Sequence, residues 1–157
     1  MIIKLIMVGK TSHDYLQKGI DDYVSRLKHY CKFEIMTIPD IKNVKNFDRE
    51  QLKTKEAEQI LKNIPVCADC ILLDEKGKEY TSVNWAQHLE QKIAHQSKDI
   101  IFVIGGSMGF GKAVYDRADN LISLSKMTFS HQMVRLIFVE QLYRAFSIMA
   151  GEPYHHE

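Results

Sequence analysis

Short, mostly apolar runs alternate along this chain with segments of helical periodicity, and this alternation constrains the fold most. The runs cover residues 2–8, 33–38, 70–74, 100–104 and 121–124. Strands that are apolar on both faces are buried on both faces, which is typical of a parallel sheet covered by helices. The sequence therefore predicts an α/β domain with a mostly parallel sheet flanked by helices.

Amphipathic helices are predicted between the runs. Apolar residues recur at three- and four-residue spacing from residue 16 to residue 30. Asp48 and Gln51 have the spacing of a capping box, which predicts the start of a charged helix. The remaining helices are expected at residues 82–93, 112–118 and 130–150. Between these elements we expect a basic loop at residues 40–47 and a turn at residues 76–78.

The size and composition favour one globular domain that spans residues 1–157. Apolar residues make up 45% of the chain and charged residues 26%, which are ordinary values for a folded domain. The longest apolar runs are too short to cross a membrane. Three cysteines are an odd number, so a disulfide framework is not expected and a reducing compartment is favoured. We therefore expect a cytosolic protein without a membrane partner.

The net charge argues against simple binding of bulk nucleic acid. Lys and Arg together number 21 and Asp and Glu 20, which gives a formal net charge of +1. A protein that holds naked nucleic acid through its phosphates usually carries a basic excess. If this chain binds nucleic acid, its positive charge must be concentrated locally, or recognition must depend on something else.

A glycine-rich segment follows the fourth predicted strand. Residues 106–112 fit the spacing of a phosphate-binding loop. The next residue is Ala113, where such loops carry the Ser or Thr that holds Mg²⁺, and Asp74 precedes the loop instead of following it. A nucleotide-binding protein is therefore only an alternative interpretation. The glycines instead predict close approach of the backbone to a ligand, at the carboxyl end of a strand.

The cysteines do not predict a metal site. Cys67 and Cys70 form one pair, and Cys31 alone does not complete a set of four zinc ligands. We therefore expect no metal.

The last third of the chain is dense in polar residues of several kinds. Residues 125–132 carry hydroxyl and amide side chains, a lysine and a histidine between the last predicted strand and the last helix. Arg135 and Arg144 are nine residues apart, so they lie on roughly opposite sides of that helix. The tail after Gly151 holds a tyrosine and two histidines, which predict either a disordered end or a catalytic arm.

These segments carry a resemblance to a known family. Residues 101–107, 124–135, 140–146 and 151–155 together resemble the large-subunit ribosomal RNA methyltransferase H family, which belongs to the SPOUT superfamily of knotted methyltransferases. The likeness spans the whole chain, including its length. It implies a C-terminal deep trefoil knot, a homodimer and a pocket for S-adenosylmethionine (SAM). The implied reaction is methylation at N3 of a pseudouridine in a hairpin of large-subunit (23S) rRNA.

The resemblance also implies roles for individual residues. The SAM pocket would be formed by Leu73, Gly105, Leu124, Ser125, Lys126, Met127, Thr128 and Phe129. Catalysis would depend on Tyr154, His155 and Arg144. RNA contacts would come from Arg135 and from His156, which stands where the family usually has Lys or Arg.

The implied chemistry makes two demands on these residues. The nucleophile must be aligned with the methyl group, and the proton on N3 must be lost by the time the bond forms. Tyr154 and His155 are candidates for base and positioning, while Arg135 and Arg144 could contact phosphate or stabilise ring charge. In a dimer, the tail of one chain could complete the pocket of its partner.

The near-neutral charge fits an enzyme that recognises one site on an assembled ribosome by shape. The expected partners are therefore a second copy of the chain and the ribosome, with no DNA. A third interpretation is a ribosome-binding factor without activity, against which the presence of Tyr154 and His155 argues.

Overall fold

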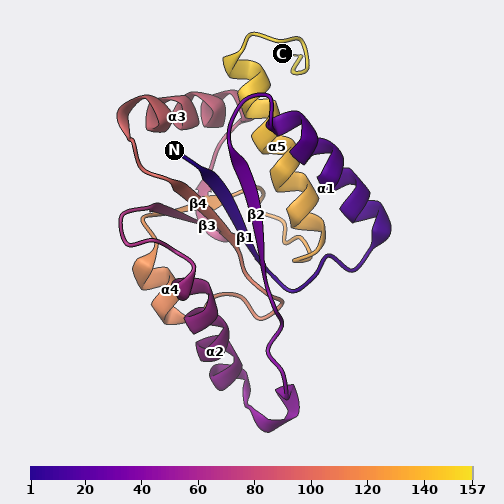
Figure 1. Cartoon of the computed structure of the whole chain (residues 1–157), viewed down its shortest axis with the longest axis vertical. Helices are drawn as coiled ribbons and strands as arrows, with labels where there is room; N and C mark the ends of the chain where they lie inside the picture. Colours follow the sequence, from indigo (N-terminus) through magenta and orange to yellow (C-terminus); the bar gives the residue numbers. More distant parts are fainter. Residues whose placement is uncertain (157) are drawn as a thin grey trace.

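A computed structural model describes residues 1–156. Five parallel strands form one sheet in the order β2-β1-β4-β3-β5, with helices on both faces (Figure 1). The strands are β1 (Ile3–Val8), β2 (Phe33–Ile38), β3 (Asp69–Glu79), β4 (Ile100–Ile104) and β5 (Asn120–Ser123). The helices are α1 (Asp14–Leu27), the 3₁₀ turn η1 (Val44–Asn46), α2 (Arg49–Lys62), α3 (Ser82–His95), α4 (Lys112–Arg117) and α5 (Met133–Met149). The predicted α/β class with a parallel sheet is confirmed.

Side chains of the central strands alternate between two apolar cores. On β4, Phe102 and Ile104 face the core that α1, α3 and α5 cover, whereas Ile101 and Val103 face the core of α2 and α4. All five residues of the strand are buried. Burial on both sides explains why this run is apolar throughout, as the parallel-sheet prediction requires.

The capping box predicted at Asp48 is present. The Asp48 carboxylate accepts the Gln51 N–H at 2.8 Å, and the Gln51 side chain accepts the Asp48 N–H at 2.9 Å. This reciprocal pair satisfies two backbone donors that a helix start otherwise leaves open. It fixes the start of α2 beside the end of the molecule where the strands terminate.

The turn predicted at residues 76–78 is wrong, because β3 continues through it to Glu79. The pairing with β5 shifts register there, since both Leu73 and Lys78 lie opposite Ile122. A Cβ atom on Gly77 would lie 2.5 Å from the Ile122 backbone nitrogen. Only glycine permits this close approach, so the residue that suggested a turn instead serves an irregular strand.

Because all strands are parallel, their carboxyl ends meet at one edge of the sheet. Helix α5 begins near that edge and carries the C-terminal tail toward the opposite one (Figure 1). The trefoil knot implied by the resemblance stays a prediction, since it depends on the path of the loops and not on strand order.

Candidate functional site

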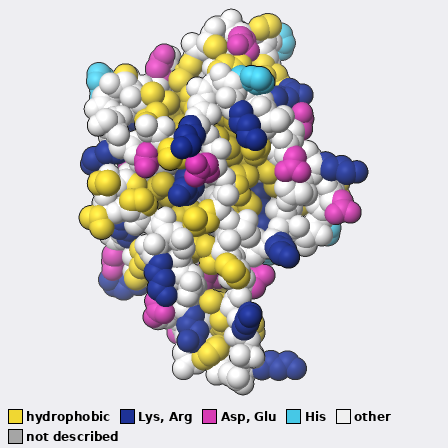
Figure 2. Space-filling view, viewed as in Figure 1, with side chains coloured by type: hydrophobic (Ala, Val, Ile, Leu, Met, Phe, Trp, Pro, Cys, Tyr) yellow, Lys and Arg dark blue, Asp and Glu magenta, His cyan; other side chains and the backbone are white. Residues whose placement is uncertain are grey.

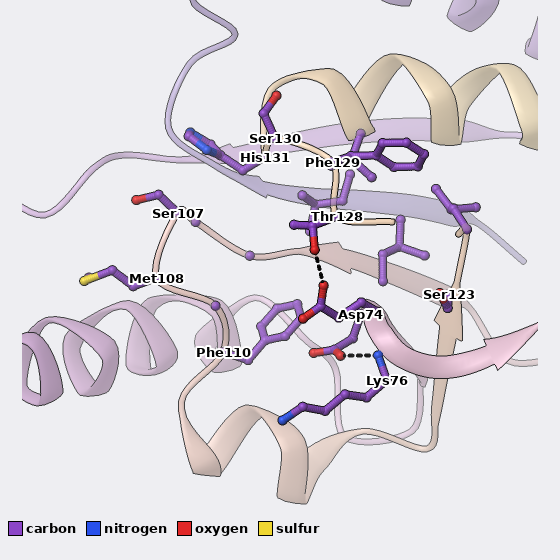
Figure 3. Close-up of a pocket in the computed structure, with 18 of the residues that line it drawn as sticks. Asp74, Lys76, Ser107, Met108, Phe110, Ser123, Thr128, Phe129, Ser130 and His131 are labelled. Carbon is purple, nitrogen blue, oxygen red and sulfur yellow. Dashed lines mark hydrogen bonds between the residues drawn. The ribbon is translucent and has the colours of Figure 1, made fainter. Parts of the chain in front are cut away.

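A cleft of about 680 Å³ lies at the carboxyl ends of β4 and β5 and beside the middle of β3. Its walls are the segments 73–76, 104–110, 122–125 and 127–131, with side chains from α2, α4 and α5. Figure 3 shows these segments converging from separate parts of the chain. The volume is within the range of small-molecule sites, and this sheet edge is where open α/β folds bind ligands.

The cleft collects most of the residues that the resemblance implied for SAM. The lining includes Leu73, Gly105, Leu124, Ser125, Met127, Thr128 and Phe129. Lys126 belongs to the same loop but does not line the cleft, and its side chain is exposed. The lining also includes Asp74 and Glu75, two carboxylates that the sequence analysis did not assign to the site.

Polar contacts hold the loop after β5 in shape. The Ser123 hydroxyl donates to the Ser125 carbonyl at 2.7 Å, and the Ser125 hydroxyl accepts the Met127 N–H at 3.0 Å. The Thr128 hydroxyl donates to the Glu75 carboxylate across the cleft, one of the bonds drawn in Figure 3. The loop therefore has a defined conformation before any ligand binds, which lowers the entropic cost of binding.

The glycine-rich wall of the cleft is supported from behind by a buried acid. Glu56 on α2 is only 8% exposed and accepts the Gly106 N–H at 3.1 Å. A Cβ atom on Gly106 would lie 2.8 Å from a Glu56 carboxylate oxygen, so the glycine permits the contact. Burial raises the pKa of Glu56, and the nearby Asp40 acts in the same direction.

An aromatic residue closes the other side of the cleft. The Tyr115 hydroxyl donates to the Asp74 carboxylate. Burial, followed by this hydrogen bond, raises the pKa of Tyr115 to about 12. The phenol therefore stays neutral at physiological pH and holds Asp74 in place as a hydrogen-bond donor.

The structure argues against the phosphate-loop alternative, because the lysine that such a loop requires, Lys112, does not line the cleft. Lys112 Nζ forms an ion pair with Asp116 at 2.6 Å, and the Lys112 side chain is not part of the cleft lining. A phosphate-binding loop needs that lysine to reach the ligand. The glycines between residues 105 and 111 instead give the cleft a wall of backbone.

The three residues expected in catalysis come together in a second cluster, at the opposite end of α5. Arg144 forms an ion pair with Glu140 at 2.6 Å and a hydrogen bond with His155 Nδ1 at 3.1 Å. The Tyr154 hydroxyl lies 3.0 Å from both Glu140 Oε1 and the Tyr23 hydroxyl. The Arg144 guanidinium also lies over the Tyr154 ring, 4.7 Å from its centroid. We call Tyr23, Glu140, Arg144, Tyr154 and His155 the tail cluster.

Two members of the tail cluster were missing from the sequence analysis. Glu140 precedes Arg144 by four residues, which is the spacing of a helical ion pair and could have indicated it. Tyr23 lies 131 residues before Tyr154, and no local pattern predicts that contact. Burial, together with hydrogen bonds to Tyr23 and Glu140, raises the pKa of Tyr154, so its phenol is neutral at physiological pH.

The cleft and the tail cluster are separated by the length of α5. Phe129 and His131 line the cleft just before α5 begins, whereas Tyr154 follows its end. A helix of 17 residues spans about 25 Å at about 1.5 Å per residue. Figure 1 shows the end of α5 far from the carboxyl ends of the strands. Within one chain, the two groups therefore cannot act on the same atom.

Arg135 does not occupy a position from which it could bind RNA. Its side chain is 0% exposed. The guanidinium donates to the carbonyl oxygens of Val8, Gly9 and His131, at 2.6 to 3.0 Å. Burial lowers the pKa of Arg135. The expected RNA contact is therefore corrected to a structural role, in which Arg135 ties the start of α5 to the end of β1. His156, by contrast, is exposed beside the tail cluster.

Residues 1–156 contain neither a metal-binding cluster nor a membrane-spanning helix. Within that range no group of three or more His, Cys, Asp or Glu side chains is placed to hold a metal ion. None of the helices described is both long enough and apolar enough to span a membrane.

Comparisons with known proteins identify the family of the chain. Residues 1–155 match the family described as predicted SPOUT methyltransferase. The ribosomal RNA large subunit methyltransferase H of Parabacteroides distasonis is 54% identical over 157 residues, which cover 100% of both chains. The protein of the same name from Flavobacterium johnsoniae is 52% identical, again over 100% of both chains. Among solved structures, a probable methylase family protein from Haemophilus influenzae aligns at 16% identity and a TM-score of 0.47, covering 99% of this chain and 70% of that one.

The parallel sheet with helices on both faces places the chain in the α/β class, with a candidate ligand cleft at the carboxyl edge of the sheet. Within that class, the chain belongs to the SPOUT methyltransferase family. The resemblance noted in the sequence is confirmed.

Proposed function

We propose that this protein is a SAM-dependent methyltransferase that modifies N3 of a pseudouridine in a hairpin of large-subunit rRNA. It acts as a homodimer on the assembled ribosome in the cytoplasm. The observation that carries the proposal is the cleft, which gathers seven residues expected to bind SAM from three separate segments of the chain. The names of the relatives, which cover the full length of the chain, support the rRNA substrate.

The residues of the cleft fit SAM chemically. Leu73, Leu124 and Phe129 provide apolar surface for an adenine ring, and the backbone at Gly105 and Gly106 can approach a ligand closely. Asp74 and Glu75 add negative charge, which suits a ligand that carries cationic groups and ribose hydroxyls. Bound there, SAM supplies an electrophilic methyl group.

The tail cluster suits the proton chemistry at the pyrimidine ring. Arginine can only donate hydrogen bonds, so His155 Nδ1 accepts from Arg144 and the neutral imidazole carries its hydrogen on Nε2. In this arrangement His155 lies beside Arg144 and helps to position the pyrimidine ring, and the proton on N3 passes to a water molecule. The positive charge of Arg144 stabilises the developing anion, and the neutral Tyr154 positions the ring. His155 becomes a base only if it exchanges its bond with Arg144.

The separation of the cleft and the tail cluster supports the dimer. One chain supplies the cleft and its partner supplies the tail cluster, so each dimer holds two composite sites. This arrangement gives both groups a common substrate, which the length of α5 denies them within one chain.

The experiment is transfer of radiolabelled methyl groups from SAM to ribosomes that lack the modification. We expect label in large-subunit rRNA, with transfer to intact ribosomes exceeding transfer to naked rRNA. The His155→Ala variant is the matched control and should bind SAM but transfer little. SAM binding without label on any ribosomal substrate would refute the substrate class. Binding of ribosomes without binding of SAM would instead favour a factor that lacks activity.

A further inference from the structure

A basic projection lies next to the cleft and has no role in the reaction described above. It comprises residues 41–55, which form the connection after β2, the turn η1 and the first half of α2. We call it the basic finger. In Figure 1 it forms the lower tip of the molecule, and in Figure 2 dark blue side chains gather over that tip.

The charge of the basic finger differs from that of the rest of the chain. Five of its side chains are basic, namely Lys42, Lys45, Arg49, Lys53 and Lys55. Two are acidic, Asp48 and Glu50, so five positive charges against two negative give a local net of +3. The whole chain carries +1, so the remainder is net negative. The local concentration of positive charge that the sequence analysis required of a nucleic-acid-binding chain is therefore found here.

No ion pair within residues 1–156 neutralises these positive charges. Over residues 1–156, ion pairs join basic side chains of α1, α3, α4 and α5 to carboxylates, but none involves the basic finger. The Asp48 carboxylate is occupied by the capping box. Lys55 Nζ lies 4.6 Å from the centroid of the Phe47 ring, a contact that leaves its charge intact. Unpaired cations focus a positive potential on the surrounding solvent.

The stability of α2 does not explain why basic residues lie at its start. Arg49 and Lys53 lie in the first two turns of α2. The N-terminal end of a helix carries a positive partial charge, so basic residues there are unfavourable for helix stability. A binding role explains their placement better than a folding role does.

The basic finger is continuous with the cleft. Arg49 and Lys53 line the wall of the cleft, whereas Lys42 and Lys45 are exposed farther out, toward the tip. Asn43 adopts a left-handed backbone conformation, with φ of 58°, that turns the chain at this point. Val44 beside it is 54% exposed. A track of positive charge therefore leads outward from the site where the methyl group is transferred.

We propose that the basic finger binds the phosphodiester backbone of the RNA that carries the target nucleotide. This inference rests on the proposed function and adds the surface that holds the substrate. Lysine ammonium groups neutralise phosphates one by one without reading bases, so the finger contributes affinity and orientation and not sequence choice. It also reconciles RNA binding with the near-neutral charge of the whole chain.

The test uses the double variant Lys42→Ala/Lys45→Ala in the full-length protein, because neither residue lines the cleft. The matched control is Lys62→Ala/Lys98→Ala, which removes two exposed lysines at the other edge of the sheet. The probe is a fluorescent hairpin RNA with the large-subunit sequence, titrated at several KCl concentrations. Each phosphate contact contributes about 0.7 to 0.9 to the slope of log Kd against log salt.

We expect the finger variant to bind the RNA about tenfold more weakly at low salt, with a slope reduced by about 1.5. Its affinity for SAM and the behaviour of the control should be unchanged. Equal slopes for the two double variants would overturn the proposal. The proposal would also be overturned if the finger variant no longer bound phosphatidylglycerol vesicles but bound the RNA as well as the unmodified protein does. If the unmodified protein methylates rRNA but the finger variant equals it, the finger proposal alone fails. If the unmodified protein neither binds nor methylates rRNA, both proposals fail.

Discussion

The two ends of α5 differ in how their polar groups are assembled. At the start of the helix, the cleft is built from strands and loops, and short-range hydrogen bonds hold the loop after β5 in shape. At its end, the tail cluster is built from side chains of α1, α5 and the tail, and the contact of Tyr23 with Tyr154 spans 131 residues. The first arrangement suits the binding of a cofactor, and the second suits proton and charge chemistry. Under the proposed dimer, their separation means that one chain holds two half-sites.

The largest expected effect is the loss of the tail cluster. His155→Ala should lower methyl transfer by about 100-fold, the scale of general acid–base or charge-stabilising groups. The affinity for SAM, measured by calorimetry, should stay within twofold, because the cleft lies at the other end of α5. His95→Ala, at an exposed histidine of α3, is the matched control and should retain most activity. If His155→Ala also lost affinity for SAM, the two ends of α5 would not act separately, and the comparison would be contradicted.

Between the two ends, Arg135 should matter for stability and not for RNA. Arg135→Met leaves the carbonyl oxygens of Val8 and Gly9 without a donor in a buried setting. The expected loss of unfolding free energy is about 3 kcal/mol, measured by urea denaturation. RNA affinity of the folded variant should be unchanged. A stable variant with weakened RNA binding would restore the RNA contact first expected for this residue.

At the cleft end, Gly105→Val should lower the affinity for SAM, which His155→Ala should leave unchanged. A Cβ atom on Gly105 would lie 3.1 Å from the Phe110 ring, so a branched side chain must crowd the cleft. We expect SAM affinity to fall about tenfold, with the circular dichroism spectrum unchanged. Ser107→Ala, on the rim of the same cleft, serves as control. Normal SAM affinity in Gly105→Val would mean that the cofactor binds elsewhere.

The smallest effect is expected at the support behind the cleft. Burial raises the pKa of Glu56, so the folded state binds a proton there more tightly than the unfolded state does. Unfolding then becomes harder as the pH falls toward the ordinary range of glutamate, and this gain is lost as the pH rises. Glu56→Gln should remove that pH dependence and raise stability near neutral pH by about 1 kcal/mol.

The measurement is the Tm of both proteins between pH 4 and pH 8. Glu58→Gln, an exposed neighbour on α2, is the control. Identical pH profiles for the unmodified protein and both variants would show that the buried Glu56 carboxyl group does not affect stability, which contradicts its role behind the cleft wall.

The fold could be predicted from the sequence because its strongest determinants are local. The wholly apolar run Ile100–Ile104 predicts a strand buried on both faces, and the pair Asp48 and Gln51 predicts the start of α2. Gly77 could not be interpreted correctly, because the close approach of β5 that requires glycine is a tertiary contact. Glycine is typical both of turns and of close contacts between strands, so its presence alone does not distinguish the two.

The candidate site shows the same difference between what local sequence determines and what only tertiary contacts determine. The residues expected to bind SAM could be named because the resemblance is carried by contiguous segments, and the structure brings seven of the eight to one cleft. Arg135 was misassigned because a charged residue on a helix is most often exposed, and only the tertiary structure shows the three backbone carbonyls that bury it. The link between Tyr154 and α1 likewise depends on packing that no sequence spacing reports.

The central claim is that a complete site needs the cleft of one chain and the tail cluster of another. The most direct measurement mixes the Gly105→Val and His155→Ala proteins at a SAM concentration far below the Kd, where each alone has at most about a tenth of the unmodified activity, and follows methyl transfer to ribosomes as subunits exchange. In a two-fold dimer, random exchange gives mixed dimers with one intact site each, so activity should recover to about a quarter of the unmodified level. No recovery, with exchange verified by mass spectrometry, would show that both groups act within one chain and contradict the account.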